Sequence, residues 1–192
     1  MAQIKKTKRL LDIIGAGILI LVLAIPMTCI ALLIVLTSGS PVLYWSDRVG
    51  VNNKIFRMPK FRTMRRDSPI LATHLLKEPE QYITVVGKFL RRMSLDELPQ
   101  LWNIINGDMS FVGPRPALYN QKDLIAVRTQ KGIHGLTPGL TGWAQIHGRD
   151  ELSLPLKVQY DEYYLIHQSW RLDLNILWHT FFKVTKGEGI SH

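Results

Sequence analysis

Two adjacent acids, Asp96 and Glu97, stand in the segment SLDELPQ, residues 94–100. Neighbouring side chains do not share a face of a helix or a strand, so we do not expect both carboxylates to point at one atom. An aspartate is a competent nucleophile toward phosphorus, and a second carboxylate suits Mg²⁺, which binds carboxylate and phosphate oxygens. The pair can therefore divide into nucleophile and metal ligand. Helix capping is the alternative, because Ser94 and Glu97 have the spacing of a capping box.

Arginines accompany the acids. Arg91 precedes them, and Arg115 stands between Pro114 and Pro116. A guanidinium fork matches phosphate oxygens in bidentate fashion, which suits the clamping of a diphosphate. An arginine flanked by two prolines loses little backbone freedom on binding, because proline fixes its own backbone angle and restricts the residue before it. A surface ion pair between Arg115 and Asp108 is the alternative interpretation.

The composition indicates a negatively charged partner. The chain of 192 residues has 24 Lys and Arg against 15 Asp and Glu, and the excess lies mainly in residues 1–9 and 42–66. Such a basic half favours nucleic acid, phosphorylated substrates or anionic lipid. Residues 54–66 lack the aromatic spacing of an RNA-binding sheet, so we expect no nucleic acid. The sequence also has no histidine spacing typical of zinc, no P-loop and no dinucleotide fingerprint.

An apolar run of 24 residues without charge covers residues 13–36 and is long enough to span a bilayer, which takes about 20 residues. Pro26 lies near its middle, where proline kinks or breaks a helix. Basic residues flank both ends, at 5–9 and 48–57, and such flanks stay in the cytoplasm. A helix that bends at Pro26 and returns to the same face satisfies both flanks. A single kinked spanning helix is the alternative.

The run and the rest of the chain predict two domains. Residues 1–41 form the basic flank and the re-entrant membrane helix, and residues 42–192 form a compact α+β catalytic domain with a small sheet. We expect β-prone segments over 42–64 with a turn at Asn52-Asn53. GPRP, at 113–116, is predicted to be extended, and 137–150 a glycine-rich loop with a short strand. The expected helices cover 81–93, 99–106, 156–167 and 172–183.

Two of these helices carry further signals. Pro99 suits the first turn of the 99–106 helix, and Gly107 suits its left-handed stop. The last helix carries Trp178, Phe181 and Phe182, which either dip into a membrane interface or face the core of the domain.

Three motifs occur in order: KFRTM (60–64), RRMSLDELPQLWNIINGDMSFVGPRP (91–116) and LTPGLTGWAQIHGRD (136–150). With them the chain resembles the bacterial sugar transferase family, in particular the small monotopic phosphoglycosyl transferases that start glycoconjugate assembly. The resemblance extends from the membrane segment to the last helix. It implies transfer of a sugar-1-phosphate from a UDP-sugar to polyprenol (undecaprenyl) phosphate, giving polyprenol diphosphate sugar and UMP. The expected place is the cytoplasmic face of the bacterial inner membrane, with the lipid bilayer as a partner and with a homodimer as a further candidate.

The resemblance also implies residue roles. Asp96 is similar to the family's nucleophile, which forms a covalent phosphosugar intermediate in a ping-pong reaction. Glu97 matches the residue that binds Mg²⁺. Arg91 and Arg115 match phosphate-contacting arginines, while Lys60 and Arg149 fall in motifs that line the site. Small stand-alone members favour N-acetylated or deoxy-amino hexoses as the sugar.

The anchor departs from the family pattern at one position. Family members resembling this chain break a re-entrant helix at a proline, and many place serine before it, where the hydroxyl bonds a freed carbonyl. This chain has Ile25 there, and Thr28 is the candidate substitute.

Two other classes stay open on the residues alone. A non-catalytic scaffold would bind anionic lipid or polymer through residues 48–66, but it gives no reason for the GPRP segment. A glycoside hydrolase would use two carboxyls about 5 Å or more apart across the sugar, for which adjacent residues are poorly placed.

Overall fold

The computed structural model describes residues 2–68, 79–148 and 152–186, and it combines helices with two small sheets. This agrees with the expected α+β class. The predicted domain boundary after residue 41 lies just before the first strand and stays a prediction. The α-helices are α1 (Ala2–Ser38), α2 (Val85–Arg92), α3 (Leu101–Asn106), α4 (Lys122–Gln130), α5 (Trp143–Ile146), α6 (Leu154–His167) and α7 (Trp170–Lys186). The strands are β1 (Leu43–Val49), β2 (Ile55–Phe61), β3 (Ser110–Val112) and β4 (Gly139–Thr141). Short 3-10 helices are η1 (Val51–Asn53), η3 (Pro79–Gln81), η4 (Leu95–Gln100) and η5 (Ile133–Gly135).

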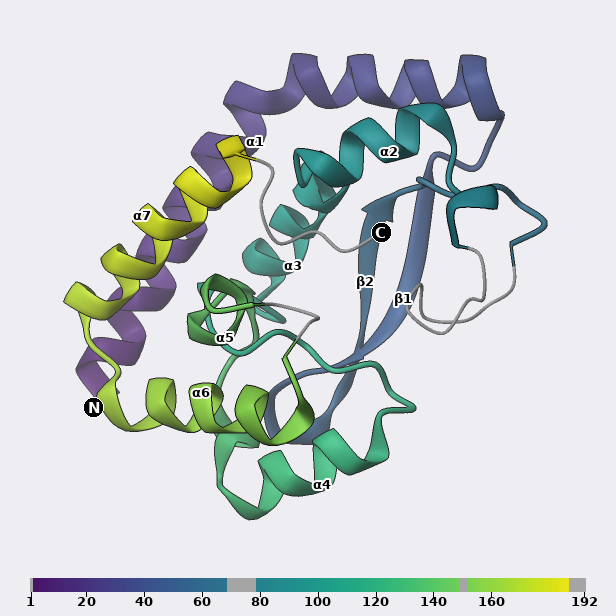
Figure 1. Cartoon of the computed structure of the whole chain (residues 1–192). Helices are drawn as coiled ribbons and strands as arrows, with labels where there is room; N and C mark the ends of the chain where they lie inside the picture. The colour runs from purple at the N-terminus through teal and green to yellow at the C-terminus, as the bar shows by residue number, and fades with distance from the viewer. Residues whose placement is uncertain (1, 69–78, 149–151, 187–192) are drawn as a thin grey trace.

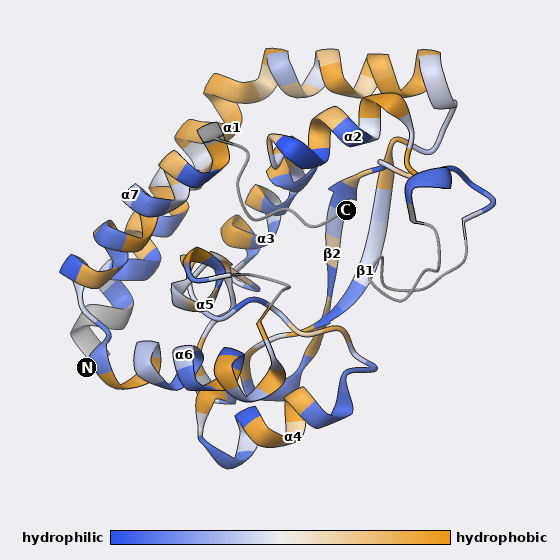
Figure 2. Ribbon diagram, in the orientation of Figure 1, coloured by the Kyte–Doolittle hydropathy of each residue, from blue (hydrophilic) through white to orange (hydrophobic). Residues whose placement is uncertain are grey.

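Helix α1 is continuous from Ala2 to Ser38 and bends into two arms, one beside α7 and one above α2 (Figure 1). The stretch Lys6–Ser38 is long and apolar enough to cross a membrane, and only 6% of its most apolar window is buried. Figure 2 shows the arm above α2 as mainly hydrophobic. Helix α1 can therefore be a membrane segment.

Pro26 lies inside α1 and, lacking an N–H, leaves the carbonyl of residue 22 without its helical donor. The Thr28 hydroxyl donates to the Ala24 carbonyl at 2.8 Å. This is a different carbonyl from the one that Pro26 frees, but bonds of this kind also bend helices. Thr28 thus supports the bend without replacing the lost bond.

The first arm of α1 is tied to the domain by polar contacts. Lys8 forms an ion pair with Asp173 on α7. The Arg9 guanidinium donates to the carbonyls of Ile104 and Ile105 at the end of α3, where a helix terminus favours positive charge. Two residues of the 5–9 cluster, which we interpreted only as a cytoplasmic flank, therefore have partners inside the protein.

Buried side chains complete this docking. Asp12, 7% exposed, accepts a hydrogen bond from the backbone N–H of Phe111, and Ala16 is fully buried. Ala16 packs in a cluster whose other buried members are Met58, Leu101, Ile104 and Met109.

The second arm docks on a different part of the same domain. Ile34, 1% exposed, packs with Phe61 of β2 and Leu90 of α2. The Arg62 guanidinium donates to the carbonyls of Ser38 and Gly39 where α1 ends. Both ends of α1 are therefore held by one domain.

Strands β1 and β2 form the expected antiparallel hairpin, with Val49 opposite Ile55 at the turn and Leu43 opposite Phe61 at the other end. Asn52 and Asn53 take positive φ angles of 53° and 60°, which asparagine tolerates better than most residues. Strands β3 and β4 form a parallel pair in the core. The expected loop at 137–150 contains β4, and also α5, which the sequence did not predict.

Helix α2 begins later than expected, at Val85, because the Thr84 hydroxyl caps it by accepting the N–H of Gly87 at 2.9 Å. The segment expected as one helix over 99–106 is the end of η4 followed by α3. Gly107 closes α3 with a φ of 95°, which confirms the left-handed stop.

Helices α6 and α7 form an angled pair at one edge of the molecule (Figure 1). Val158 and Tyr164 of α6 and Ile176 of α7 enter the core. Trp178, Phe181 and Phe182 are 64%, 62% and 40% exposed. The core interpretation of these three aromatic residues is therefore wrong.

Candidate active site

The acids Asp96 and Glu97 lie in the first turn of η4 and are buried, at 7% and 9% exposure. Ser94 before them has a left-handed backbone, with φ of 54°, and its side chain makes no capping bond. The capping-box interpretation is therefore wrong, and the carboxylates are available for other contacts.

Lys60 on β2 reaches both acids. Its Nζ lies 2.7 Å from Glu97 Oε1 and 3.7 Å from Asp96 Oδ2. The two carboxylates approach one ammonium but do not form a symmetric pair around it, which agrees with the expectation for adjacent side chains. The convergence is asymmetric, with the shorter contact at Glu97.

Arg115 joins the same acid from the proline-flanked segment. Its Nη2 donates to Glu97 Oε1 at 3.0 Å. Asp108 instead accepts a hydrogen bond from Asn103. The alternative pairing of Arg115 with Asp108 is therefore wrong, and Glu97 Oε1 accepts from two cations.

Arg91, in the last turn of α2, borders the other acid. Its Nε donates to Thr63 Oγ1 at 2.9 Å. Burial lowers the pKa of Arg91, and the charge of Asp96 opposes this effect. Burial raises the pKa of Asp96, while Lys60 is the foremost of the cations that lower it. Burial and the charges of Lys60, Arg91 and Arg115 thus act in opposite directions on the pKa of Asp96.

The segment 114–117 is held through its backbone. The carbonyl of Pro114 accepts from Gly139 N at 2.9 Å, and that of Arg115 accepts from Arg128 Nη1 at 2.8 Å. The carbonyl of Pro116 accepts from Arg48 Nη1 at 3.2 Å, and that of Ala117 accepts from Val49 N at 2.9 Å. These donors come from β4, α4 and β1. The extended segment predicted for GPRP is therefore rigid in the folded protein, because each successive carbonyl has a donor from another element.

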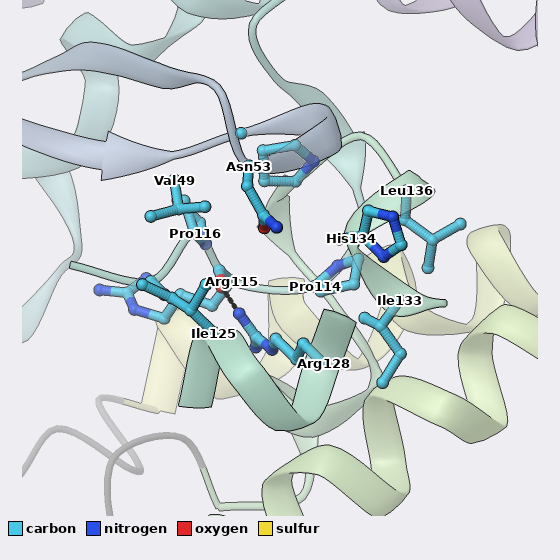
Figure 3. A pocket seen from close by; sticks show the side chains of 13 residues that line it. Val49, Asn53, Pro114, Arg115, Pro116, Ile125, Arg128, Ile133, His134 and Leu136 are labelled. Atoms are coloured by element: carbon cyan, nitrogen blue, oxygen red, sulfur yellow. Dashed lines mark hydrogen bonds between the residues drawn. The ribbon is translucent and has the colours of Figure 1, made fainter. Parts of the chain in front are cut away.

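Behind this segment lies a pocket that the acids do not line (Figure 3). Its walls include Pro114, Arg128 and His134, and Figure 3 shows Arg128 bonded to the Arg115 carbonyl. The carboxylates instead meet Lys60 and Arg115 in the charge cluster, which is therefore the candidate active site.

The structure thus gathers five of the predicted site residues from separate elements: Lys60, Arg91, Asp96, Glu97 and Arg115. Arg149 lies outside the described residues. The roles assigned to all six stay predictions.

The donor set of the cluster suits Mg²⁺ better than zinc. Within the described ranges, no three His, Cys, Asp or Glu side chains gather in a metal-binding group. Mg²⁺ is usually held by one or two carboxylates with substrate phosphates and waters, not by an all-protein cage. The carboxylate of Glu97, which is the expected metal ligand, fits that description.

Sequence reasoning missed Arg128 and Asp161, which lie behind the site. Asp161 follows Val158 and precedes Tyr164 at intervals of three, and all three are buried on α6. The sequence signal for Asp161 was its position among the apolar residues that α6 buries. A buried carboxylate requires a partner, so this position indicates a buried cation nearby.

Comparisons with known proteins show which family this chain is similar to. A model of the family described as bacterial sugar transferase matches residues 3–187. An uncharacterized sugar transferase of Bacillus subtilis (strain 168), EpsL, is 41% identical over 95% of this chain and 89% of its own length.

Two other relatives carry names that state reactions. A UDP-N-acetylgalactosamine-undecaprenyl-phosphate N-acetylgalactosaminephosphotransferase of Aeromonas hydrophila is 36% identical over 95% of this chain. A UDP-glucose:undecaprenyl-phosphate glucose-1-phosphate transferase of Escherichia coli (strain K12) is 36% identical over 92%. The matched parts are 44% and 39% of those two proteins, so this chain spans less than half of each. The family match covers nearly all of this chain, which therefore belongs to the bacterial sugar transferase family.

Proposed function

We propose that this chain is a phosphoglycosyl transferase that moves a sugar-1-phosphate from a UDP-sugar to polyprenol phosphate, giving polyprenol diphosphate sugar and UMP. The names of relatives support the reaction class, since they state sugar-phosphate transfer to undecaprenyl phosphate. The observation that carries the proposal is the charge cluster, where two buried carboxylates meet Lys60, Arg91 and Arg115. Phosphoryl transfer relies on such positioning and charge stabilisation.

In the first proposed step, an Oδ of Asp96 attacks the phosphorus that carries the sugar. A bond forms between that oxygen and phosphorus, and the bond from phosphorus to the oxygen bridging the two phosphates breaks. The bridging oxygen keeps the electron pair and leaves as part of UMP. Asp96 attacks as the carboxylate, and the neighbouring cations favour that form against the effect of burial.

In the second step, a phosphate oxygen of polyprenol phosphate attacks the same phosphorus and the Asp96 carboxylate leaves. The nucleophile is restored without gain or loss of a proton. This two-step exchange is the ping-pong mechanism. It requires that UMP depart before the lipid acceptor reacts.

The other residues of the cluster have supporting roles. Arg91 and Arg115 bind the phosphates of the donor, and Lys60 offsets the negative charge of the two acids. Glu97, with the donor phosphates, would hold Mg²⁺. When bound, the ion neutralises charge that develops on the phosphate oxygens.

The docking of α1 supports a re-entrant arrangement in a bilayer. Lys8 and Arg9 bind the domain near one end of α1, while Ile34 packs on the same domain near the other end. A helix with both ends on one water-exposed domain enters and leaves the membrane on the same side. The positive charge of both flanks places that side in the cytoplasm of a bacterium. The exposed aromatic residues of α7 then lie in the interface.

The test is UMP release from a panel of UDP-sugars with Mg²⁺, with and without undecaprenyl phosphate. The panel includes glucose, galactose and their N-acetylated amino forms. We expect acceptor-dependent turnover with one donor, most readily an N-acetylated hexose. Salt-sensitive binding to anionic lipid without UMP release from any donor would contradict the proposal and favour a scaffold.

A further inference from the structure

A buried ion pair lies behind the site and has no role in the reaction described above. Arg128 of α4 donates from Nε and Nη2 to one carboxylate oxygen of Asp161 on α6, at 3.0 and 2.6 Å. The two side chains are 9% and 2% exposed. The remaining terminal nitrogen, Nη1, donates to the backbone carbonyl of Arg115 at 2.8 Å, as Figure 3 shows.

Stability alone does not account for this arrangement. A buried ion pair gains little over well-packed apolar side chains, because desolvation offsets the attraction between the charges. An apolar pair would fill the same space between α4 and α6. It would lack, however, a donor for the carbonyl of Arg115.

That carbonyl belongs to the residue whose side chain enters the charge cluster. The Arg115 guanidinium contacts Glu97 Oε1 at 3.0 Å on the opposite side of the segment. Fixing the backbone of a residue at its own carbonyl limits where its side chain can reach. Asp161 in turn holds the Arg128 fork by two bonds to one oxygen, so that the third nitrogen has a defined direction.

We propose that Arg128, oriented by Asp161, is a positioning residue that fixes the backbone of Arg115 and thereby aims its guanidinium at the donor phosphate. This inference rests on the proposed function, in which Arg115 binds that phosphate. It assigns a consequence for substrate binding to two residues that lie outside the charge cluster.

The first variant is Arg128→Met with Asp161→Leu, which removes both charges and keeps side chains of similar length. We expect the double variant to unfold at or above the wild-type temperature, while KM for the UDP-sugar rises about 10- to 100-fold, since small misplacements of a binding group have effects of this size. The kcat at saturating donor should change much less than KM.

A matched control exists on the same two elements. Lys131, which follows α4, pairs with Glu162 of α6 at the surface, with side chains 40% and 33% exposed. Lys131→Met with Glu162→Leu removes an ion pair between the same two parts of the fold and leaves the bonds of the 114–117 segment in place. Its KM should stay within about 2-fold of wild type, as expected for an exposed pair.

If the double variant fails to fold, Arg128→Lys replaces it. A lysine keeps a positive charge beside Asp161. Its single ammonium, however, lacks the planar guanidinium geometry with which Arg128 bonds Asp161 and the Arg115 carbonyl at the same time. We again expect a raised KM in a folded protein. A wild-type KM in either folded variant would overturn the proposal.

A double-mutant cycle separates positioning from a general structural effect. In the Arg115→Ala background, the Arg128 and Asp161 changes should add less than about 2-fold to KM, because the side chain they aim is gone. If the Arg128 and Asp161 changes raise KM by the same factor with and without Arg115→Ala, the positioning role is overturned. A wild-type KM for Arg115→Ala itself would instead refute the phosphate-binding role in the proposed function, so the two failures are distinguishable. All variants are full-length protein in lipid nanodiscs.

Discussion

Replacing Lys60 by methionine removes an ammonium that contacts both acids. Asp96 and Glu97 are 7% and 9% exposed, and the site would lose a contact of 2.7 Å to Glu97 and one of 3.7 Å to Asp96. A unit charge pair at 2.7 Å attracts by about 6 kcal/mol at an effective dielectric constant near 20, before desolvation is subtracted. Removal of one partner of a buried pair costs about 3–5 kcal/mol in measured cases.

We therefore expect Lys60→Met to lower the free energy of unfolding by about 3–5 kcal/mol at neutral pH. For a chain of this size each kcal/mol corresponds to roughly 2–4 °C, so the unfolding temperature should fall by roughly 6–20 °C. The measurement is thermal unfolding of the full-length protein in nanodiscs.

The pH dependence of this loss has a definite sign. Burial raises the pKa of Asp96 in the folded state, so the folded protein keeps its proton to a higher pH than the unfolded chain. Stability contributed by this group is therefore present at low pH and is lost as pH rises through the folded pKa. Without Lys60 that pKa rises further, so the deficit of the variant should be large at pH 7.5 and small near pH 5.

Lys88→Met is the matched control. Lys88 Nζ lies 3.9 Å from Glu80 Oε2, and both side chains are more than 60% exposed. We expect a change within about 1 kcal/mol, as for other surface pairs. The reasoning is refuted if Lys60→Met unfolds at the wild-type temperature at pH 7.5, or if its deficit is equal at the two pH values.

Three further predictions concern the elements that support the site. Gly87→Ala should lower both the unfolding temperature and the affinity for the UDP-sugar. A Cβ there would lie 2.0 Å from the Thr63 carbonyl oxygen and would push away the helix that carries Arg91. Gly17→Ala is the control: a Cβ at residue 17 meets nothing within 4 Å, so its unfolding temperature should be unchanged or higher. The pKa that governs the acid limb of the profile of kcat/KM against pH should be higher than that of an ordinary aspartate, since burial raises the pKa of Asp96. An acid-limb pKa at or below the ordinary aspartate value would contradict the assignment of Asp96 as the nucleophile. Ile34→Ala should cost about 2–5 kcal/mol in unfolding experiments, and a cost under about 0.5 kcal/mol would show that this arm of α1 is not docked.

Local signals in the sequence predicted much of the fold. Gly107 ends α3 with a left-handed backbone, and Asn52 and Asn53 form the hairpin turn, because these conformations favour those residue types. Segment 113–116 is not helical, as its prolines predict. Even where a boundary moved, as at the start of α2, the cause was local: the hydroxyl of Thr84 caps the helix.

Contacts between distant segments were outside the reach of such signals. Nothing in the local pattern pairs Lys8 with Asp173, or Arg9 with the end of α3. For the same reason the cluster at 5–9 was interpreted only by its charge. Of the five gathered site residues, Asp96, Glu97, Arg91 and Arg115 could be selected by residue type and spacing, whereas Lys60 was selected only through the family resemblance. Arg128 lies in none of the three motifs that carry this resemblance.

The central claim is that Asp96 becomes covalently bonded to the sugar phosphate. The most direct measurement is peptide mass analysis of full-length protein mixed with the productive UDP-sugar and Mg²⁺, without acceptor, and quenched within the first turnover. We predict one sugar-phosphate adduct on the peptide that contains Asp96, together with release of one equivalent of UMP. Both should be absent in Asp96→Asn, which we expect to fold, and the adduct should disappear on addition of undecaprenyl phosphate. Acceptor-dependent turnover by Asp96→Asn at the wild-type rate, or an adduct on another residue, would contradict the account.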